Sequence, residues 1–200
     1  MARLQAIEPQ AFDPSVQAAL GQAVLANAQG LGLLRVLAQR PDLTTAFLDF
    51  RAAVGDASRL PARLVELVRL RVAFHNQCRS CMALRSASAA ADGVTEELVC
   101  SLEAPEEAAD LTDAEKAALA YADLLATDHL AADDRMFDRL REHFSEPEIV
   151  ELGFHLALFV GLGRLSATWD LVDDLPERFH DRTAPVTPWG ATDSVVADHR

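Results

Sequence analysis

The sequence predicts an all-α, single-domain protein. Alanine and leucine, which favour helices, are abundant, whereas the strand-favouring residues include only two isoleucines, Ile7 and Ile149, and one tyrosine, Tyr121. Prolines and glycines divide the 200-residue chain into segments whose apolar residues lie three and four positions apart, the spacing of amphipathic helices. No long linker separates these segments. We therefore expect a helical bundle over residues 1–175 and an extended tail over residues 176–200.

The first half of the chain contains five expected helices. They cover residues 14–28, 33–38, 43–55, 61–74 and a last segment that begins after Asn76, carries two cysteines and ends near Gly93. Pro61 is suited to the first turn of its helix, where the missing N–H costs nothing. Asn76 is a favourable N-cap residue, so it is expected to start the cysteine-bearing helix.

The second half contains four more expected helices. They are residues 95–102, a helix that begins at Thr112 with its apolar run at 119–125, residues 133–144 and residues 149–171. Thr112 with Glu115, and Ser145 with Glu148, have the form of capping boxes. The last helix is apolar nearly all round, which predicts burial in the core or against a partner subunit.

The charge of the chain excludes several classes of partner. The chain has 18 basic and 31 acidic residues, a net charge of −13, so polyanions such as nucleic acid or an anionic membrane surface are repelled. The first residues contain no apolar signal-peptide core, and no uncharged stretch reaches the length of a membrane span. We expect a cytoplasmic protein that binds neither nucleic acid nor membranes.

The three cysteines are Cys78, Cys81 and Cys100. A C-x-x-C pair in a reducing compartment indicates redox or metal chemistry rather than a structural disulfide. On a continuous helix Cys78, Cys81 and Arg85 share one face. With Asn76 as N-cap, Cys78 lies in the first turn, where the helix dipole favours a thiolate.

Arginines surround this pair in the sequence. Residues 59–85 contain six arginines and one carboxylate, Glu66, whereas residues 86–115 contain nine carboxylates and no basic residue. An electropositive setting lowers the pKa of a cysteine and favours attack on peroxides or disulfides. We therefore expect the cysteines to lie in a basic environment. Glu66 itself is either a functional carboxylate, with Arg85 as a possible buried partner, or a surface ion pair with Arg63 or Arg69.

Two further readings of the cysteines remain open. A zinc site formed by His75, Cys78, Cys81 and Cys100 is arithmetically possible, but no second pair stands at finger or ribbon spacing. Cys100 is otherwise expected to pack as a small hydrophobic residue. No phosphate-binding glycine motif is present, so we expect no nucleotide, metal or other cofactor.

The stretch of residues 60–90 resembles the carboxymuconolactone decarboxylase superfamily, in its alkylhydroperoxidase D-like branch. The branch has a glutamate twelve residues before C-x-x-C, matched by Glu66, and an asparagine two before the first cysteine, matched by Asn76. Further similarity lies in residues 34–41, 111–122, 144–152 and 163–165, so the resemblance covers residues 30–172.

The resemblance implies an alkylhydroperoxidase D-like helical bundle that forms a homo-oligomer, a trimer or hexamer. It also implies a peroxidase or thiol-disulfide oxidoreductase in which Cys81 attacks a small peroxide, Cys78 resolves the product as a disulfide, Glu66 relays protons and a thiol or dithiol restores the pair. The relay histidine of the branch is replaced by Arg85, which cannot release a proton. His75 or His155 could substitute for it, although either could also be an ordinary hydrogen-bonded histidine. The alternative is a non-catalytic or redox-sensing helical oligomer.

Overall fold

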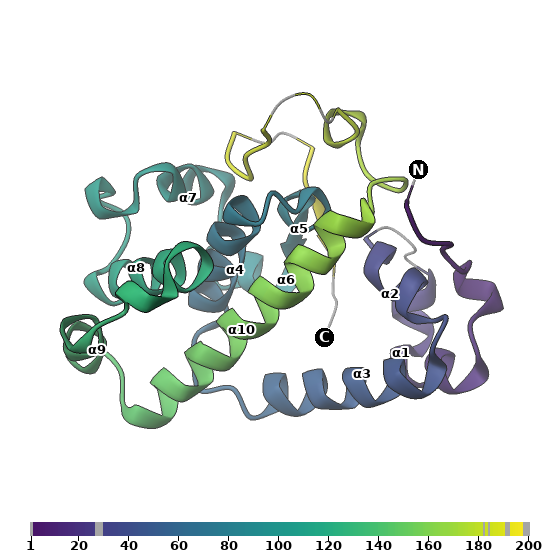
Figure 1. Cartoon of the computed structure of the whole chain (residues 1–200), viewed down its shortest axis with the longest axis horizontal. Helices are drawn as coiled ribbons and strands as arrows, with labels where there is room; N and C mark the ends of the chain where they lie inside the picture. Colours follow the sequence, from purple (N-terminus) through teal and green to yellow (C-terminus); the bar gives the residue numbers. More distant parts are fainter. Residues whose placement is uncertain (1, 27–29, 182, 184, 191–192, 198–200) are drawn as a thin grey trace.

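The computed structural model describes residues 2–26, 30–181, 183, 185–190 and 193–197, and its chain is mostly helical (Figure 1). The helices are α1 (Pro14–Ala26), α2 (Gly32–Leu37), α3 (Pro41–Asp56), α4 (Ala62–His75), α5 (Arg79–Ala83), α6 (Ala87–Ala91), α7 (Glu96–Cys100), α8 (Asp113–Thr127), α9 (Asp134–Arg141) and α10 (Glu146–Trp169). The expected segmentation is largely confirmed. The last two residues of the helix expected at 14–28 lie outside the described residues.

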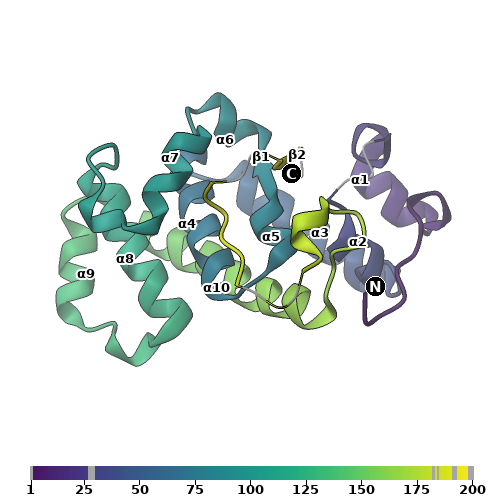
Figure 2. The same ribbon diagram turned by 90° about the horizontal axis from the view of Figure 1, so that it is seen from above.

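Helix α4 lies at the centre of the fold. It packs against α8 and α10, and Leu67, Val68, Leu70 and Val72 are fully buried in the main core. Helices α1 to α3 lie at one end of the molecule and α8 with α9 at the other (Figures 1 and 2). Because the cysteines follow directly after α4, the most buried helix of the fold fixes their position.

Both expected capping boxes are confirmed. The Thr112 side chain accepts from the Glu115 N–H while the Glu115 carboxylate accepts from the Thr112 N–H, and Ser145 and Glu148 form the same pattern at α10. Helix α10 is long and apolar enough to cross a membrane by length and composition alone. It packs on α4, α5 and α8 and buries the polar His155, but its burial is only partial, because Val150, Phe154 and Leu165 are exposed.

The single cysteine-bearing helix expected after Asn76 does not form. Instead of one helix after Asn76, the chain forms α5, a short strand β1 (Leu84–Ser86) and α6. Cys78, not Asn76, is the N-cap of α5. The Asn76 amide is used elsewhere, since its Nδ2 donates to the carbonyl of Phe159 on α10 at 3.0 Å.

The chain after residue 175 adds to this region. It contains a 3₁₀ turn (Glu177–Phe179) with Phe179 fully buried, and a strand β2 (Val195–Ala197) that pairs with β1 in parallel. The register places Arg85 opposite Val196. Figure 2 shows this C-terminal segment running past α4 and α5 to reach β1. The all-α expectation is therefore corrected by one small parallel sheet.

Candidate functional site

Cys78 and Cys81 form a disulfide whose Cα atoms are 5.2 Å apart. The two cysteines differ in access, because Cys78 is fully buried and Cys81 is partly exposed. The N–H of Cys81 also points at Cys78 Sγ, with 3.3 Å between the nitrogen and the sulfur. A donor at that distance stabilises negative charge on Cys78 when the bond is opened. Cys81 is therefore the more accessible of the two cysteines.

The chain enters this pair through a residue in the left-handed backbone region. Gln77 has φ 48°, a conformation that costs a non-glycine residue on the order of 1 kcal/mol. Its side-chain amide compensates by donating to Phe74 O at 2.8 Å and by exchanging two hydrogen bonds with the backbone of Val186, at 3.2 and 3.1 Å. The turn that places Cys78 thus depends on the C-terminal segment.

Two segments that carry the family resemblance, one at Asn76 and one at residues 163–165, contact each other just before Cys78 in the chain. Arg164 on α10 donates from Nε to Asn76 Oδ1 at 3.2 Å and from Nη2 to the carbonyl of Ala126 at 2.6 Å. Gly163 lies against the same amide, and a Cβ there would stand 2.5 Å from Asn76 Nδ2. A side chain at position 163 would therefore push the Asn76 amide away from its hydrogen bonds where α10 crosses the end of α4.

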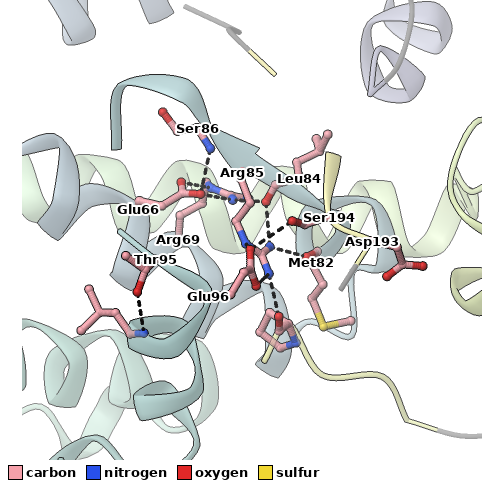
Figure 3. Close-up of polar contacts among 12 residues, drawn as sticks. Glu66, Arg69, Met82, Leu84, Arg85, Ser86, Thr95, Glu96, Asp193 and Ser194 are labelled. Carbon is pink, nitrogen blue, oxygen red and sulfur yellow. Dashed lines mark hydrogen bonds and ion pairs between the residues drawn. The ribbon is translucent and has the colours of Figure 1, made fainter. Parts of the chain in front are cut away.

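Glu66 is buried and paired with Arg69, one of the partners considered from the sequence. Arg69 donates to both carboxylate oxygens at 2.7 Å, and the Ser86 N–H donates to Oε1 at 3.0 Å (Figure 3). Burial alone would raise the pKa of Glu66, but Arg69 and these hydrogen bonds outweigh it, so the pKa lies below its usual range. Glu66 is thus held ionised.

Arg69 connects Glu66 to the cysteines. Its Nη1 donates to the carbonyl of Cys81 at 2.7 Å, and its Nη2 donates to that of Leu84 at 2.8 Å. The Glu66–Arg69 pair therefore fixes the backbone of the C-x-x-C loop. Sequence reasoning did not assign this role to Arg69, although its i,i+3 spacing from Glu66 is a signal for the pairing.

The surroundings of Arg85 also differ from the expectation. The strand at residues 84–86 removes it from the face expected for the cysteines, and all five of its N–H donors are used (Figure 3). Nε and Nη2 bind Glu96 at 2.8 and 3.0 Å, and Nη1 binds the carbonyls of Met82 and Leu84 at 2.8 and 3.0 Å. The second Nη2 hydrogen bond, 2.7 Å long, goes to Pro188 O. No N–H of Arg85 is left for a thiolate.

His75 ends α4 and contacts Asp123 on α8. Its Nε2 lies 2.7 Å from Asp123 Oδ1, and Arg71 binds the same carboxylate through Nε and Nη2 at 2.6 and 2.9 Å. Burial tends to raise the pKa of Asp123, but His75 and Arg71 together lower it. This charged carboxylate orients the imidazole. Asp123 was missed from the sequence because its partners are about fifty residues away in the chain.

His155, the other candidate histidine, lies on α10 beside Phe159 and Glu151. It is stacked on Phe159 with ring centroids 5.8 Å apart, and its Nε2 is 3.6 Å from Glu151 Oε1, beyond hydrogen-bond distance. Burial lowers the pKa of His155, and the charge of Arg51 lowers it further against the opposing effect of Glu151. His155 is thus a buried imidazole that favours the neutral form.

The expected basic environment is largely neutralised. Arginines of the basic segment pair with carboxylates, including Arg63 with Glu115 and Arg85 with Glu96, both from the acidic segment at 86–115. Among the described residues, no group of three or more His, Cys, Asp or Glu side chains could hold a metal ion. Cys100 is exposed at the end of α7, so the expectation that it packs as a small hydrophobic residue is wrong.

Residues 41–124 match the model of the carboxymuconolactone decarboxylase family. The resemblance inferred from the sequence is confirmed over these residues. The chain is also 40% identical, over 118 residues, to an uncharacterized protein of Mycobacterium tuberculosis; the match covers 58% of this chain and 41% of that protein. The chain therefore spans about two fifths of the curated relative that it matches.

Solved structures show the same fold. An uncharacterized peroxidase-related protein from Ralstonia eutropha, described as an alkylhydroperoxidase AhpD core, superposes with a TM-score of 0.69 at 20% identity, covering 89% of this chain and 94% of that one. A cysteine-to-alanine variant of the debrominase Bmp8, in complex with 2,3,4-tribromopyrrole, gives a TM-score of 0.66 at 21% identity, covering 87% and 94%. At these identities the similarity establishes an AhpD-like fold.

Proposed function

We propose that this protein is a thiol-dependent oxidoreductase that reduces small peroxides through Cys78 and Cys81. The observation that carries the proposal is the disulfide itself, with one fully buried and one partly exposed cysteine at the N-terminus of α5. The match of residues 41–124 to the carboxymuconolactone decarboxylase family model and the AhpD-like fold support it.

The proposed cycle has three steps. The Cys81 thiolate attacks the peroxide, the O–O bond breaks, and the alkoxide or hydroxide leaves with a proton while Cys81 becomes a sulfenic acid. Cys78 then attacks Cys81 Sγ, forming the disulfide and releasing water. An external dithiol reduces the disulfide: its thiolate attacks the accessible Cys81 Sγ, Cys78 leaves as a thiolate next to the Cys81 N–H, and the second thiol releases Cys81.

The other predicted site residues have different parts in this proposal. Glu66 and Arg85 are positioning residues, because Glu66 acts through Arg69 on the Cys81 carbonyl and Arg85 is committed to five other acceptors. His75, oriented by Asp123 and three residues before Cys78, is our candidate for the group that delivers the proton. The chemistry requires no bound cofactor.

Steady-state peroxide consumption with dithiothreitol as reductant tests the proposal. Cys81→Ser is expected to abolish turnover. Without dithiothreitol, reduced Cys78→Ser should consume one equivalent of peroxide and then stop at a sulfenic acid on Cys81, because the resolving thiol is gone. Cys100→Ser is the matched control and should turn over like the wild type. Equal peroxide consumption by the wild type and Cys81→Ser would rule the proposal out.

A second candidate function is a redox sensor with little turnover. The observation that favours it is the engagement of Glu66 and Arg85 in ion pairs, which leaves neither free to move a proton. A sensor would form the disulfide once with peroxide but regenerate slowly. Turnover of less than about one peroxide per minute, against a usual enzyme range of about 1 to 1000 per second, would favour this candidate.

We also propose that the protein forms a homo-oligomer, as the resemblance implies. Helix α10 exposes Val150, Phe154 and Leu165, which follow one another at helical spacing along its outer face. Apolar side chains in such a row favour contact with another chain. Analytical ultracentrifugation of the wild type and Phe154→Glu tests this: the wild type should sediment as a trimer or hexamer and the variant as a smaller species. A monomeric wild type would contradict it.

A further inference from the structure

The C-terminal strap, defined here as the described residues 185–190 and 193–197, is attached to the chain on both sides of the C-x-x-C pair. Before the pair, Gln77 exchanges two hydrogen bonds with the backbone of Val186. After the pair, Arg85 donates to Pro188 O at 2.7 Å and β1 pairs with β2. The strap therefore crosses the segment of chain that contains the disulfide.

Side chains strengthen these attachments. The Trp189 ring lies 4.6 Å from that of Phe74, centroid to centroid, and Ser194 Oγ donates to Glu96 Oε1 at 3.0 Å. Figure 3 shows Glu96 between Arg85 and Ser194, so one carboxylate joins β1 to the strap. Position 85, where the family branch has a histidine, is thus used here as an anchor for the C-terminus.

The strap also contributes to the apolar surroundings of the disulfide. Cys81 and Val186 pack against the same buried cluster, whose largest member, Phe179, lies just before the strap in the chain. The fully buried Cys78 is preceded by Gln77, which holds Val186. Access to the cysteines is therefore limited on the side that the strap covers.

We infer that the strap is a specificity-determining element, which admits small peroxides and small thiols to Cys81 and excludes protein-sized thiols unless it detaches. This inference rests on the proposed thiol chemistry of Cys81, but it concerns access alone. The hydrogen bonds that hold the strap go to Gln77, Arg85 and Glu96, which all lie outside α4, so the strap can open locally without unfolding α4. A bulky reagent reacts only with the open form, whereas a small one also reacts with the closed form.

Alkylation of the reduced wild-type protein gives a first test. Cys81 is labelled with iodoacetamide, or with a maleimide that carries a polyethylene glycol chain, and peptide mass spectrometry follows each cysteine. The exposed Cys100 is the internal reference. The ratio of bulky to small labelling rates is expected to be about tenfold lower at Cys81 than at Cys100, which corresponds to about 1.4 kcal/mol against opening. Equal ratios at the two cysteines would overturn the inference.

The variant Val196→Pro tests whether the strap is what slows bulky labelling of Cys81. Proline removes an N–H from β2 and is incompatible with the strand interior, whereas Val196→Ala keeps the N–H and changes a side chain that is 54% exposed. Labelling of Cys81 by the bulky maleimide should rise about tenfold in Val196→Pro, which corresponds to about 1.4 kcal/mol in the free energy of strap opening. It should stay unchanged in Val196→Ala.

Trp189→Ala is the second, independent variant. It removes the contact with Phe74 but leaves β2 intact, so it should also speed bulky labelling while iodoacetamide labelling changes little. Circular dichroism and the melting temperature identify any variant that has lost its fold. If either variant keeps its helix content and the bulky rate at Cys81 stays at the wild-type value, the inference is wrong. Because no peroxide enters these assays, they are independent of a failure of the proposed activity.

Discussion

Arg85 binds Glu96 with two hydrogen bonds, from Nε to Oε1 at 2.8 Å and from Nη2 to Oε2 at 3.0 Å. Arg85 is 94% buried, whereas the Glu96 side chain is 39% exposed. Restoring the family's histidine with Arg85→His therefore removes the Arg85 donors of Pro188 O and of Glu96, which keeps only the hydrogen bond from Ser194. We predict a loss of about 2 kcal/mol in the free energy of unfolding, below the full cost of a broken buried pair because Glu96 is partly solvated.

Urea denaturation of the wild type, Arg85→His and Arg85→Lys measures this loss. Lysine keeps the charge but not the planar fork, so it should recover only part of the stability. The alternative prediction from the sequence is that Arg85→His raises peroxidase turnover, because a missing relay limits the reaction. An increase in turnover with unchanged stability would show that Arg85 is not the anchor described here.

Glu66→Gln tests the ion pair that holds the Cys81 backbone. Because the folded-state pKa of Glu66 is lowered, its stabilising contribution is present above its unfolded pKa of about 4.3 and is lost as the pH falls through the folded value. The variant should be destabilised by about 3 kcal/mol at neutral pH. The difference from the wild type should shrink in acid. A constant difference between about pH 7 and about pH 3 in urea denaturation would contradict the lowered pKa.

His155→Phe separates a second pH effect. Burial lowers the pKa of His155, so the unfolded chain takes up a proton below about pH 6.5 that the folded chain resists. The wild type should lose stability as the pH falls from about 6.5 toward the folded pKa, and the variant should lose less over that window. Thermal melts at a series of pH values measure the difference. Parallel pH profiles for the two proteins would mean that His155 titrates normally in the folded state.

Gly163→Ala tests the crossing of α10 over the end of α4. A Cβ at position 163 would stand 2.5 Å from Asn76 Nδ2, whereas one at Gly161 meets nothing within 4 Å. We predict that Gly163→Ala costs about 1–3 kcal/mol and that Gly161→Ala, the matched control on the same helix, stabilises by about 0.5–1 kcal/mol. Equal effects of the two substitutions on the melting temperature would contradict the crossing.

The sequence predicts those features that depend on neighbouring residues. The capping boxes at Thr112 and Ser145, the apolar character of α10 and the C-x-x-C pair are local patterns, and the structure contains them. The break after Ala83 is not local. It depends on Arg85 binding Pro188, 103 positions later, and on strand pairing with residues 195–197. No pattern near Arg85 distinguishes an anchor from a residue that faces the cysteines.

The candidate site shows the same division. Glu66 and the cysteines are identified by their spacing, and Arg69 could be paired with Glu66 from the i,i+3 rule alone. Asp123, which binds His75 and Arg71, lies on a helix that its own sequence marks only as amphipathic. The arginines that suggest a basic site in the sequence are neutralised by carboxylates from α7 and α8, and sequence position does not reveal such pairings.

The most direct test of the proposed function is a count of thiols after a single exposure to peroxide. The reduced Cys100→Ser protein, which keeps only Cys78 and Cys81, is treated with one equivalent of hydrogen peroxide and its free thiols are titrated. We predict the loss of both thiols and a mass consistent with the Cys78–Cys81 disulfide. When Cys81→Ser is combined with Cys100→Ser in one protein, no disulfide should form. Retention of both thiols in the Cys100→Ser protein would contradict the account.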